Sequence, residues 1–189
     1  MFSRTSSFLP VPKEDFNTIK DSTKFTRGEI EYLYTRFRTL GEPKGRVSFL
    51  LKRDFDFPSH ALHSLILSEM FGSKNQINFV EFAKFLYIFR AFDSKTSKEE
   101  QTAIQTKKLK LLFSMYDVNK DGSISKQDLL DIVHRLYSNY TNIQTMVRIV
   151  HIVMKEMDNS NTNQILFNDF CKALEVFDMD NLVVKFPTL

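Results

Sequence analysis

Twelve consecutive residues, 117–128, carry oxygen-bearing side chains at alternating places. These side chains belong to Asp117, Asn119, Asp121, Ser123, Ser125 and Asp128. A hard divalent cation such as calcium takes six or seven oxygen ligands at about 2.3–2.6 Å, and a tightly curled loop brings alternate residues to one centre. Gly122, at the sixth place, has no Cβ atom and therefore allows the sharp turn that such a loop needs. The chemistry that these residues favour is the binding of calcium.

The order of these ligands is that of an EF-hand calcium loop. We expect side-chain oxygens from four residues, namely Asp117, Asn119, Asp121 and Asp128. Ser123 should contribute its backbone carbonyl, and Ser125 should bind directly or through water. The alternative is a solvated turn between two helices, but helical patterns flank the loop on both sides, as the motif requires. We also expect Ile124 to pair with a partner loop.

The twelfth and last place holds Asp128, where a glutamate that binds through both oxygens is usual. The shorter aspartate reaches an ion less easily with two oxygens. We therefore expect weaker calcium binding than in a loop that ends in glutamate, and better tolerance of magnesium, which prefers octahedral geometry. Calcium is the predicted cofactor, and magnesium is able to bind at the same site.

Residues 158–169 form a second, weaker candidate site. Its candidate ligands are Asp158, Ser160, Thr162, Gln164 and Asp169. Only two of them are carboxylates, and Leu166 stands at the ninth place. Asn163 replaces the turning glycine, although asparagine tolerates the left-handed conformation better than most residues. Because ligand charge tunes affinity, this loop is a poorer calcium site than residues 117–128.

Two earlier stretches keep the pattern of a hand but lose its ligands. In the later one, Ile77 and Glu81 stand at the eighth and twelfth places, but Lys74 fills the fifth. In the earlier one, Val47-Ser48 resembles the eighth and ninth places, and Leu51 stands where the last carboxylate belongs. We expect neither stretch to bind an ion.

Helical patterns surround all four loops. Thr26 and Glu29 have the spacing of a capping box, and the apolar residues after them predict a helix from about Arg27 to Thr39. Residues 13–20 are able to form a short helix. Thr96 with Glu99 could cap another. An aromatic stripe follows the second hand, and its exposed parts could line a groove for a partner helix; it consists of Phe79, Phe82, Phe85, Leu86 and Phe89.

The chain is therefore predicted to be all-α, with four EF-hands paired into two lobes. An N-terminal arm covers residues 1–25, and an N-terminal lobe with the two degenerate hands covers residues 26–90. The polar residues 91–106 have the composition of a linker. Residues 107–178 form the C-terminal lobe with hands three and four, and residues 179–189 form a C-terminal tail.

Composition excludes several other functions. The net charge of +3 is small and scattered, which argues against nucleic-acid binding. Cys171 is the single cysteine, so no internal disulfide is expected, as in cytosolic proteins. No apolar run is long enough to span a membrane. The four histidines are expected in surface or packing roles rather than as zinc ligands. No nucleophile, base or cofactor motif is assembled, so an enzyme is not predicted.

Four hands in two lobes, followed by an apolar tail, resemble the calcineurin B group, and the calcineurin homologous proteins are the most similar members. The similar stretches are Met1–Ser6, Leu33–Leu40, Tyr116–Asp121 and Val183–Phe186. The resemblance implies two naturally silent hands, a competent third hand and a normally competent fourth one. This sequence departs from the group at the fourth hand. It also has Phe2 where the group has a myristoylated glycine, so N-myristoylation is not expected.

The resemblance also implies a function, which is to hold an amphipathic helix of a client protein. For calcineurin homologous proteins the client is the cytosolic juxtamembrane helix of a sodium/proton exchanger. For calcineurin B it is the catalytic subunit of a phosphatase. The chain would then be a cytoplasmic regulatory subunit that reaches the plasma membrane only through its partner. The alternative from another class is a free calcium sensor or buffer.

Overall fold

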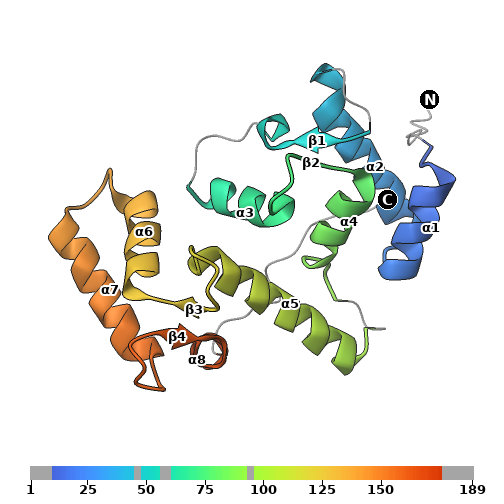
Figure 1. The fold of residues 1–189 in the computed structure, drawn as a ribbon. Coiled ribbons are helices and arrows are strands. Elements are labelled where there is room, and N and C mark those ends of the chain that lie inside the picture. The colour runs from blue at the N-terminus through green and yellow to red at the C-terminus, as the bar shows by residue number, and fades with distance from the viewer. Residues whose placement is uncertain (1–9, 45–47, 56–60, 93–95, 176–189) are drawn as a thin grey trace, which may run out of the picture. The chain divides into compact units, whose positions relative to one another are not determined.

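A computed structural model describes residues 10–175 except 45–47, 56–60 and 93–95 (Figure 1). In this part of the chain the structure contains eight α-helices, two short 3-10 helices and four strands of two residues each. The predicted all-α fold with paired EF-hands is thereby confirmed. None of the helices in the described ranges has the length and apolar character needed to cross a membrane.

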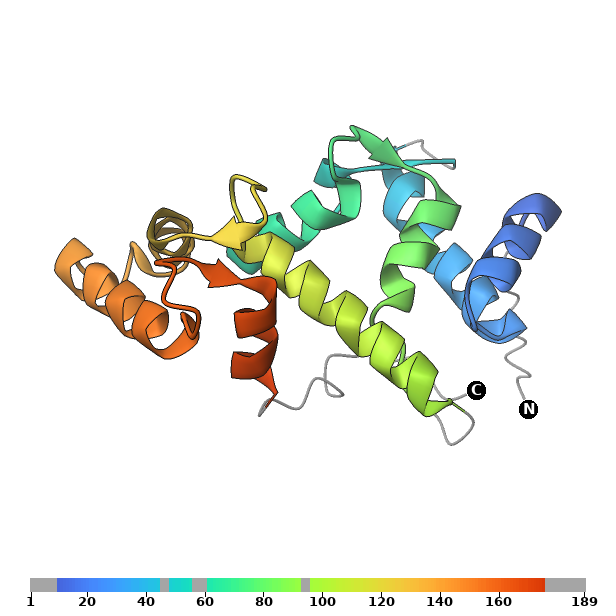
Figure 2. The same cartoon turned by 60° about the horizontal axis from the view of Figure 1, so that its bottom comes forward.

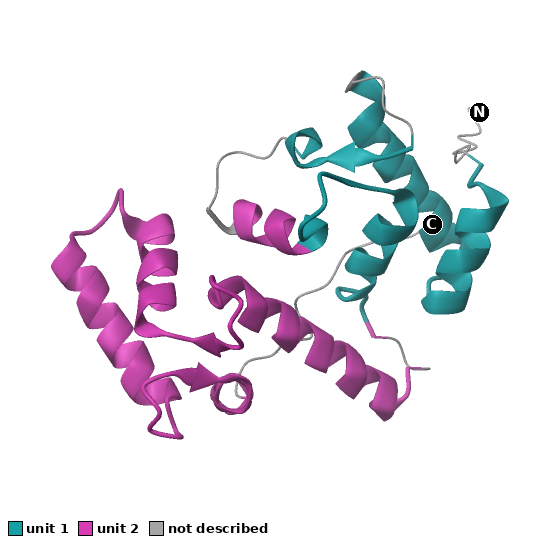
Figure 3. Ribbon diagram, viewed as in Figure 1, with its two compact units in different colours: residues 1–56, 70–91, 183–189 teal, residues 57–69, 92–182 magenta. Residues whose placement is uncertain are grey.

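The described residues pack into two compact units (Figure 3). Unit 1 contains those within 1–56 and 70–91, and unit 2 contains those within 57–69 and 92–182. Helix α5 (Lys98–Tyr116) belongs to unit 2. It starts inside the stretch 91–106, which has the composition of a linker. Among the polar residues of this stretch, Lys98, Glu99 and Thr102 are exposed on the first turns of that helix. The predicted lobe boundaries remain a prediction.

Unit 1 is built around the first two hands. Its elements are α1 (Lys13–Ser22), α2 (Arg27–Gly41), η1 (Glu42–Lys44), β1 (Leu50–Leu51), η2 (Lys52–Asp54), β2 (Gln76–Ile77) and α4 (Phe79–Tyr87). Helix α2 begins with the predicted capping box: Thr26 Oγ1 accepts the Glu29 N–H, and Glu29 accepts the Thr26 N–H. Phe37 on α2 packs against Phe79 and Phe82 on α4, with ring centroids 5.5 and 5.6 Å apart. Phe79 and Phe82 of the aromatic stripe are therefore buried in the core, whereas Phe85, Leu86 and Phe89 are partly exposed.

The pairing of β1 with β2 corrects the predicted register of the first hand. Leu50 lies opposite Ile77 in this antiparallel pair. Since Ile77 holds the eighth place of its loop, Leu50 holds the eighth place of the first loop, and Asp54 holds the twelfth. The predicted places of Val47-Ser48 and Leu51 in the first loop are therefore wrong by three residues. The apolar pattern around Leu50 and Leu51 repeats that of Val47, and the loop has no acidic residue that marks its start.

Unit 2 is built around hands three and four. Its elements are α5 (Lys98–Tyr116), β3 (Ser123–Ile124), α6 (Lys126–Tyr137), α7 (Ile143–Met157), β4 (Ile165–Leu166) and α8 (Phe167–Leu174). Most of α3 (Ala61–Phe71) belongs to this unit as well. Helix α5 begins at Ser97, whose side chain accepts the Glu100 N–H, one residue later than the predicted cap at Thr96.

Strands β3 and β4 join the two loops of unit 2 (Figure 2). Ile124 lies opposite Ile165, so the predicted pairing of Ile124 with a partner loop is confirmed. Both isoleucine side chains are almost completely buried. Phe113 at the end of α5 packs edge-on against Phe170 of α8, with ring centroids 5.4 Å apart. Helices and loops of hands three and four therefore share one core.

Candidate metal centre

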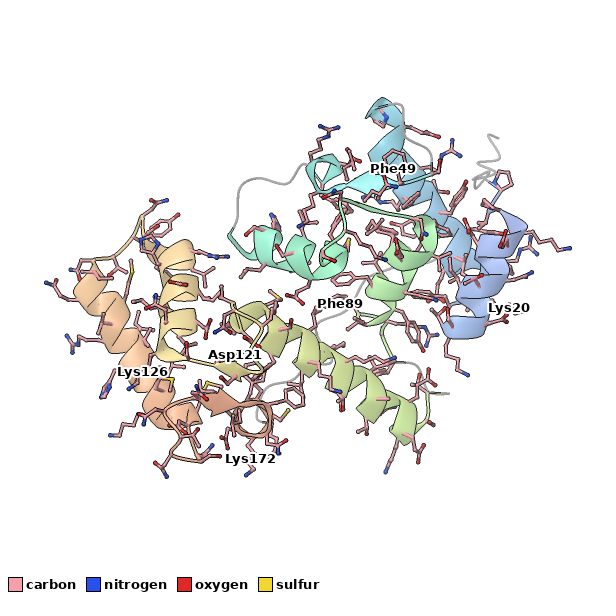
Figure 4. The ribbon with its side chains drawn as sticks, viewed as in Figure 1. Lys20, Phe49, Phe89, Asp121, Lys126 and Lys172 are labelled. Atoms are coloured by element: carbon pink, nitrogen blue, oxygen red, sulfur yellow. The ribbon has the colours of Figure 1, made fainter. Side chains whose placement is uncertain are left out.

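The candidate site of hand three lies in the turn between α5 and α6, where Asp121 is labelled in Figure 4. Asp117 ends α5 and is buried. Its Oδ1 accepts the Asp121 N–H at 3.1 Å, and its Oδ2 accepts the Gly122 N–H at 2.9 Å. Gly122 has a φ of 91°, which a residue without Cβ adopts freely. The first and sixth places are thus folded as an ion-binding loop requires.

The middle of the loop gathers further oxygen atoms around Asp121. Asn119 Oδ1 accepts the Asp121 N–H at 3.0 Å, and Asn119 Nδ2 donates to Asp121 Oδ2 at 2.8 Å. Asp121 Oδ1 accepts both the N–H and the hydroxyl of Ser123, at 2.9 and 2.8 Å. Hydrogen bonds lower the pKa of the Asp121 carboxyl, with the largest effect from Asn119 and a smaller one from Ser123. The carboxylate charge that a cation needs is therefore retained.

Asp128, at the twelfth place, is buried and also caps the start of helix α6. Its Oδ2 accepts the N–H and the hydroxyl of Ser125, at 2.9 and 2.5 Å. Its Oδ1 accepts the Val118 N–H at 3.2 Å. Ser125 and Asp128 therefore form the capping box of α6, and the same carboxylate closes the loop onto its second residue.

Helix α3 supports this loop through a contact that the sequence did not predict. Lys120 adopts the left-handed conformation, with φ 59°. Its ammonium lies 2.6 Å from Oε1 of Glu69, and Ser114 Oγ donates to Oε2 of the same carboxylate at 2.8 Å. Glu69, Ser114 and Lys120 all belong to unit 2. A basic residue at the fourth place was the available signal, but its partner is distant in the sequence.

The donor set of hand three suits a hard cation only if neutral oxygens take part. Within the ranges that the structure describes, no three His, Cys, Asp or Glu side chains gather closely enough to hold a metal ion by themselves. The amide of Asn119 and the oxygens of Ser123 and Ser125 would have to complete the shell. Carboxylate, amide, hydroxyl and carbonyl oxygens are the ligands that calcium and magnesium prefer, so the residues present fit such an ion.

Hand four folds on the same backbone frame as hand three. Asp158 Oδ1 accepts the Thr162 N–H at 2.9 Å, and its Oδ2 accepts the Asn163 N–H at 2.8 Å. Asn163 takes the left-handed conformation with φ 60°, as predicted from its replacement of glycine. The difference lies across the loop, where Ser160 Oγ donates to Oδ2 of the buried Asp169 at 2.6 Å. A hydroxyl thus meets the last carboxylate directly.

Hand two replaces the ion with a lysine side chain. The ammonium of Lys74, at the fifth place, forms an ion pair with the carboxylate of Glu81, at the twelfth. This contact, followed by the backbone hydrogen bond from Asn78, lowers the pKa of Glu81. Asn78 and Glu81 also form the capping box of α4. The loop therefore carries its own positive charge beside its last carboxylate.

Hand one keeps a buried acid at its last place. Asp54 is 3% exposed, and its Oδ2 accepts the Leu51 N–H at 2.8 Å. This is the contact that Asp128 makes with Ser125 in hand three. All four loops therefore end in an acid, although the first two have no other acidic ligand.

The remaining reactive side chains form no second site in the described residues. His134 and His151 are exposed on α6 and α7, as expected for surface residues. Cys171 is half-buried on α8. Burial, with a smaller contribution from the charge of Glu175, raises the pKa of its thiol. A raised pKa leaves less of the reactive thiolate at neutral pH.

The fold contains two pairs of hands, and a short antiparallel pairing of strands joins the loops within each pair. Residues 106–175 match the family of EF-hand domain pairs. Over most of its length the chain is also similar to two kinds of known protein. It is 29% identical to the calcineurin B protein of Naegleria gruberi, with 96% of this chain and 97% of that protein covered.

Calcineurin B homologous protein 3 of Homo sapiens is 25% identical, with 88% of each chain covered. The type 1 calcineurin B protein of Dictyostelium discoideum is 28% identical, with 84% of each chain covered. The resemblance to the calcineurin B group is confirmed. The chain is therefore similar to both calcineurin B and the calcineurin B homologous proteins, and its residues 106–175 match an EF-hand domain pair.

Proposed function

We propose that this protein is a calcium-binding, non-catalytic regulatory subunit that holds an amphipathic helix of a partner protein. The observation that carries the proposal is an apolar groove in unit 2, with a volume of about 370 Å³. Among the residues that the structure describes, those that line it are all apolar or tyrosine. Those on four helices include Leu112, Leu136, Val153 and Leu174. A partner helix that presents apolar residues at intervals of three and four fits such a groove.

The proposed metal site is hand three, with Asp117, Asn119, Asp121, Ser123, Ser125 and Asp128 as ligands. Calcium is the proposed ion, and magnesium competes because the shorter Asp128 disfavours a seven-oxygen shell. Hand four, with Asp158, Ser160, Thr162, Gln164 and Asp169, is the weaker proposed site. Ion binding at hand three would stabilise unit 2, since any ligand that binds only the folded state does so.

For the partner we propose the cytosolic juxtamembrane helix of a sodium/proton exchanger, following the resemblance to calcineurin homologous proteins. The protein would then act in the cytoplasm and reach the plasma membrane through that partner. The second candidate is the catalytic subunit of a phosphatase. This candidate is favoured by the similarity to calcineurin B proteins, because the similarity to one of them extends over 96% of this chain.

A pull-down with tagged full-length protein, run in parallel with calcium, magnesium and chelator, tests the proposal. Recovery of an exchanger under all three conditions would establish a constitutive role in a transporter complex. Recovery of a phosphatase catalytic chain would select the second candidate. If no protein is recovered in stoichiometric amount, the proposed role fails, and a free calcium sensor or buffer takes its place.

A further inference from the structure

The segment from Ile132 to Lys155 contains no acidic residue. It covers the second half of α6, the turn after it and most of α7. Its charged residues are Arg135, Arg148 and Lys155. Glu156, which follows directly, is exposed on the last turn of α7, so the stretch without acids ends there.

The same segment exposes large apolar side chains. Tyr140 is 83% exposed, Ile143 53% and Val147 51%. Val147, His151 and Lys155 follow Ile143 at intervals of four residues, so they form one ridge along the helix. Arg148, His151 and Lys155 are exposed as well. We call this surface the α7 face; it consists of Tyr140, Ile143, Val147, Arg148, His151 and Lys155.

The α7 face is not needed for the core of unit 2. Another side of α7 is already buried there through Met146, Val150 and Met154. Helix α7 contributes Val153 and Met157 to the groove, and both lie outside the α7 face. In the part of the chain that the structure describes, the exposed apolar residues of the α7 face therefore belong neither to the core of unit 2 nor to the proposed helix groove.

An exposed surface of apolar and basic residues without acids is complementary to the surface of an anionic membrane. Apolar side chains enter the boundary between headgroups and acyl chains, and tyrosine is favoured at this depth. Each Lys or Arg near an anionic leaflet adds about 1 kcal/mol of attraction, whereas an acid would oppose it.

We propose that the α7 face binds anionic lipid surfaces directly. Tyr140, Ile143 and Val147 enter the interfacial layer, and Arg148 and Lys155 contact the anionic headgroups. This contact goes beyond the proposed function, in which the partner protein alone brings the chain to a membrane. It uses other residues than the groove, so the two proposals can fail separately.

The test is sedimentation of full-length protein with vesicles, in the presence of calcium and of chelator. Vesicles of phosphatidylserine and phosphatidylcholine in equal amounts should bind the protein, and vesicles of phosphatidylcholine alone should not. Binding should weaken as salt is added, because salt screens exposed charges. Absence of binding to the anionic vesicles, with calcium and with chelator, overturns the proposal.

Variants then locate the contact. The double variant R148Q/K155Q should bind anionic vesicles about 25-fold more weakly, at roughly fivefold per lost charge. The double variant Y140S/V147S should also lose binding. The matched control is K107Q/K110Q, which removes the same charge from exposed positions on α5. Melting curves and binding of a helical peptide to the groove would verify that each variant is folded.

Two outcomes would overturn the assignment of the α7 face. The first is equal weakening by K107Q/K110Q and R148Q/K155Q, which would indicate attraction by total charge. The second is unchanged vesicle binding by Y140S/V147S, together with loss of binding to an acidic amphipathic peptide. That result would assign the face to a protein partner instead.

Discussion

Ser160 Oγ lies 2.6 Å from Oδ2 of Asp169, so a hydrogen bond joins the third and twelfth places of the fourth loop. Asp169 is only 2% exposed. In a loop filled by a cation these two places would meet through the ion. Hand four thus closes its loop with a hydrogen bond from the hydroxyl at the third place to the carboxylate at the last place.

The change Ser160→Ala should destabilise the protein by about 1–3 kcal/mol, because it leaves a buried carboxylate without this donor. Urea denaturation in chelator would measure the loss. Ser138→Ala, at the exposed C-cap of α6, is the matched control and should have little effect. Equal stability of the S160A variant and the natural protein would show that the hydrogen bond contributes nothing.

The double change Ser160→Asp and Thr162→Asp should turn hand four from a weak into a tight calcium site. The frame is already present, since Asp158 accepts the N–H groups of Thr162 and Asn163. Two more carboxylates would supply the missing ligand charge. Isothermal titration calorimetry should then find one more bound calcium ion than in the natural protein. An unchanged stoichiometry would contradict this role for ligand charge.

At hand three, Asp117→Asn should weaken calcium binding by more than about tenfold, because ligand charge sets affinity. Asp128→Glu should strengthen calcium binding and reduce competition by magnesium, because the longer side chain reaches the ion with both oxygens.

Calorimetric titrations with calcium and with magnesium would compare both hand-three variants with Asp131→Asn, a change on α6 outside the loop. Tighter magnesium binding by D128E would be evidence against this explanation.

In hand two, the ion pair between Lys74 and Glu81 makes part of the stability of unit 1 depend on pH. The pKa of Glu81 is lowered in the folded protein from the ordinary value of 4.5. As the pH falls below that value, the unfolded chain binds a proton first, so stability declines down to the lowered pKa. Above pH 4.5 the contribution is fully present.

Lys74→Gln should raise the pKa of Glu81 and flatten this acid dependence. At neutral pH the loss should be only about 0.2–1 kcal/mol, since Lys74 is largely exposed. NMR titration of the Glu81 carboxyl carbon would measure the pKa, with Lys84→Gln, an exposed change on α4, as control. An unmoved pKa in K74Q would mean that the backbone hydrogen bond from Asn78 alone lowers it.

In the groove of unit 2, Val153→Asp should abolish binding of an amphipathic helical peptide, because a charge would be buried against apolar side chains. Ile152→Asp is the matched control, since Ile152 is 53% exposed and does not line the groove. Fluorescence anisotropy with a labelled peptide would compare them. Calcium binding by V153D would show that the variant is folded. Similar peptide affinity of V153D and I152D would exclude this groove as the binding site.

Much of the fold could be predicted because EF-hands carry strong local signals. Capping boxes, the apolar eighth place and the turning Gly122 each fix a short piece of backbone. The prediction of Ile124 pairing succeeded for the same reason. The predicted register was wrong in the first hand, where no acid stands at the early ligand places and Ser48 replaces the turning glycine. Only the strand pairing of Leu50 identified Asp54 as the last place.

Other features depend on contacts between distant residues or on exposure. The contact of Lys120 with Glu69 joins a loop to a helix far away in the sequence. The local pattern therefore shows a basic residue at the fourth place but does not identify its partner. The polar start of α5 has the composition of a linker because exposed helical turns are polar too. Lys74 could have been identified as a replacement for the ion, since it stands at a ligand place and Glu81 remains at the last one.

The short pairing of Ile124 with Ile165 also bears on the order of folding. The two residues are far apart in the sequence, so their pairing closes a long chain segment at a considerable entropic cost. Helices α6 and α7, which pack against each other within that segment, form through more local contacts. We expect the helical hairpin to appear first and the two loops to mature late and together. A nascent chain would then gain its ion-binding competence in one late step.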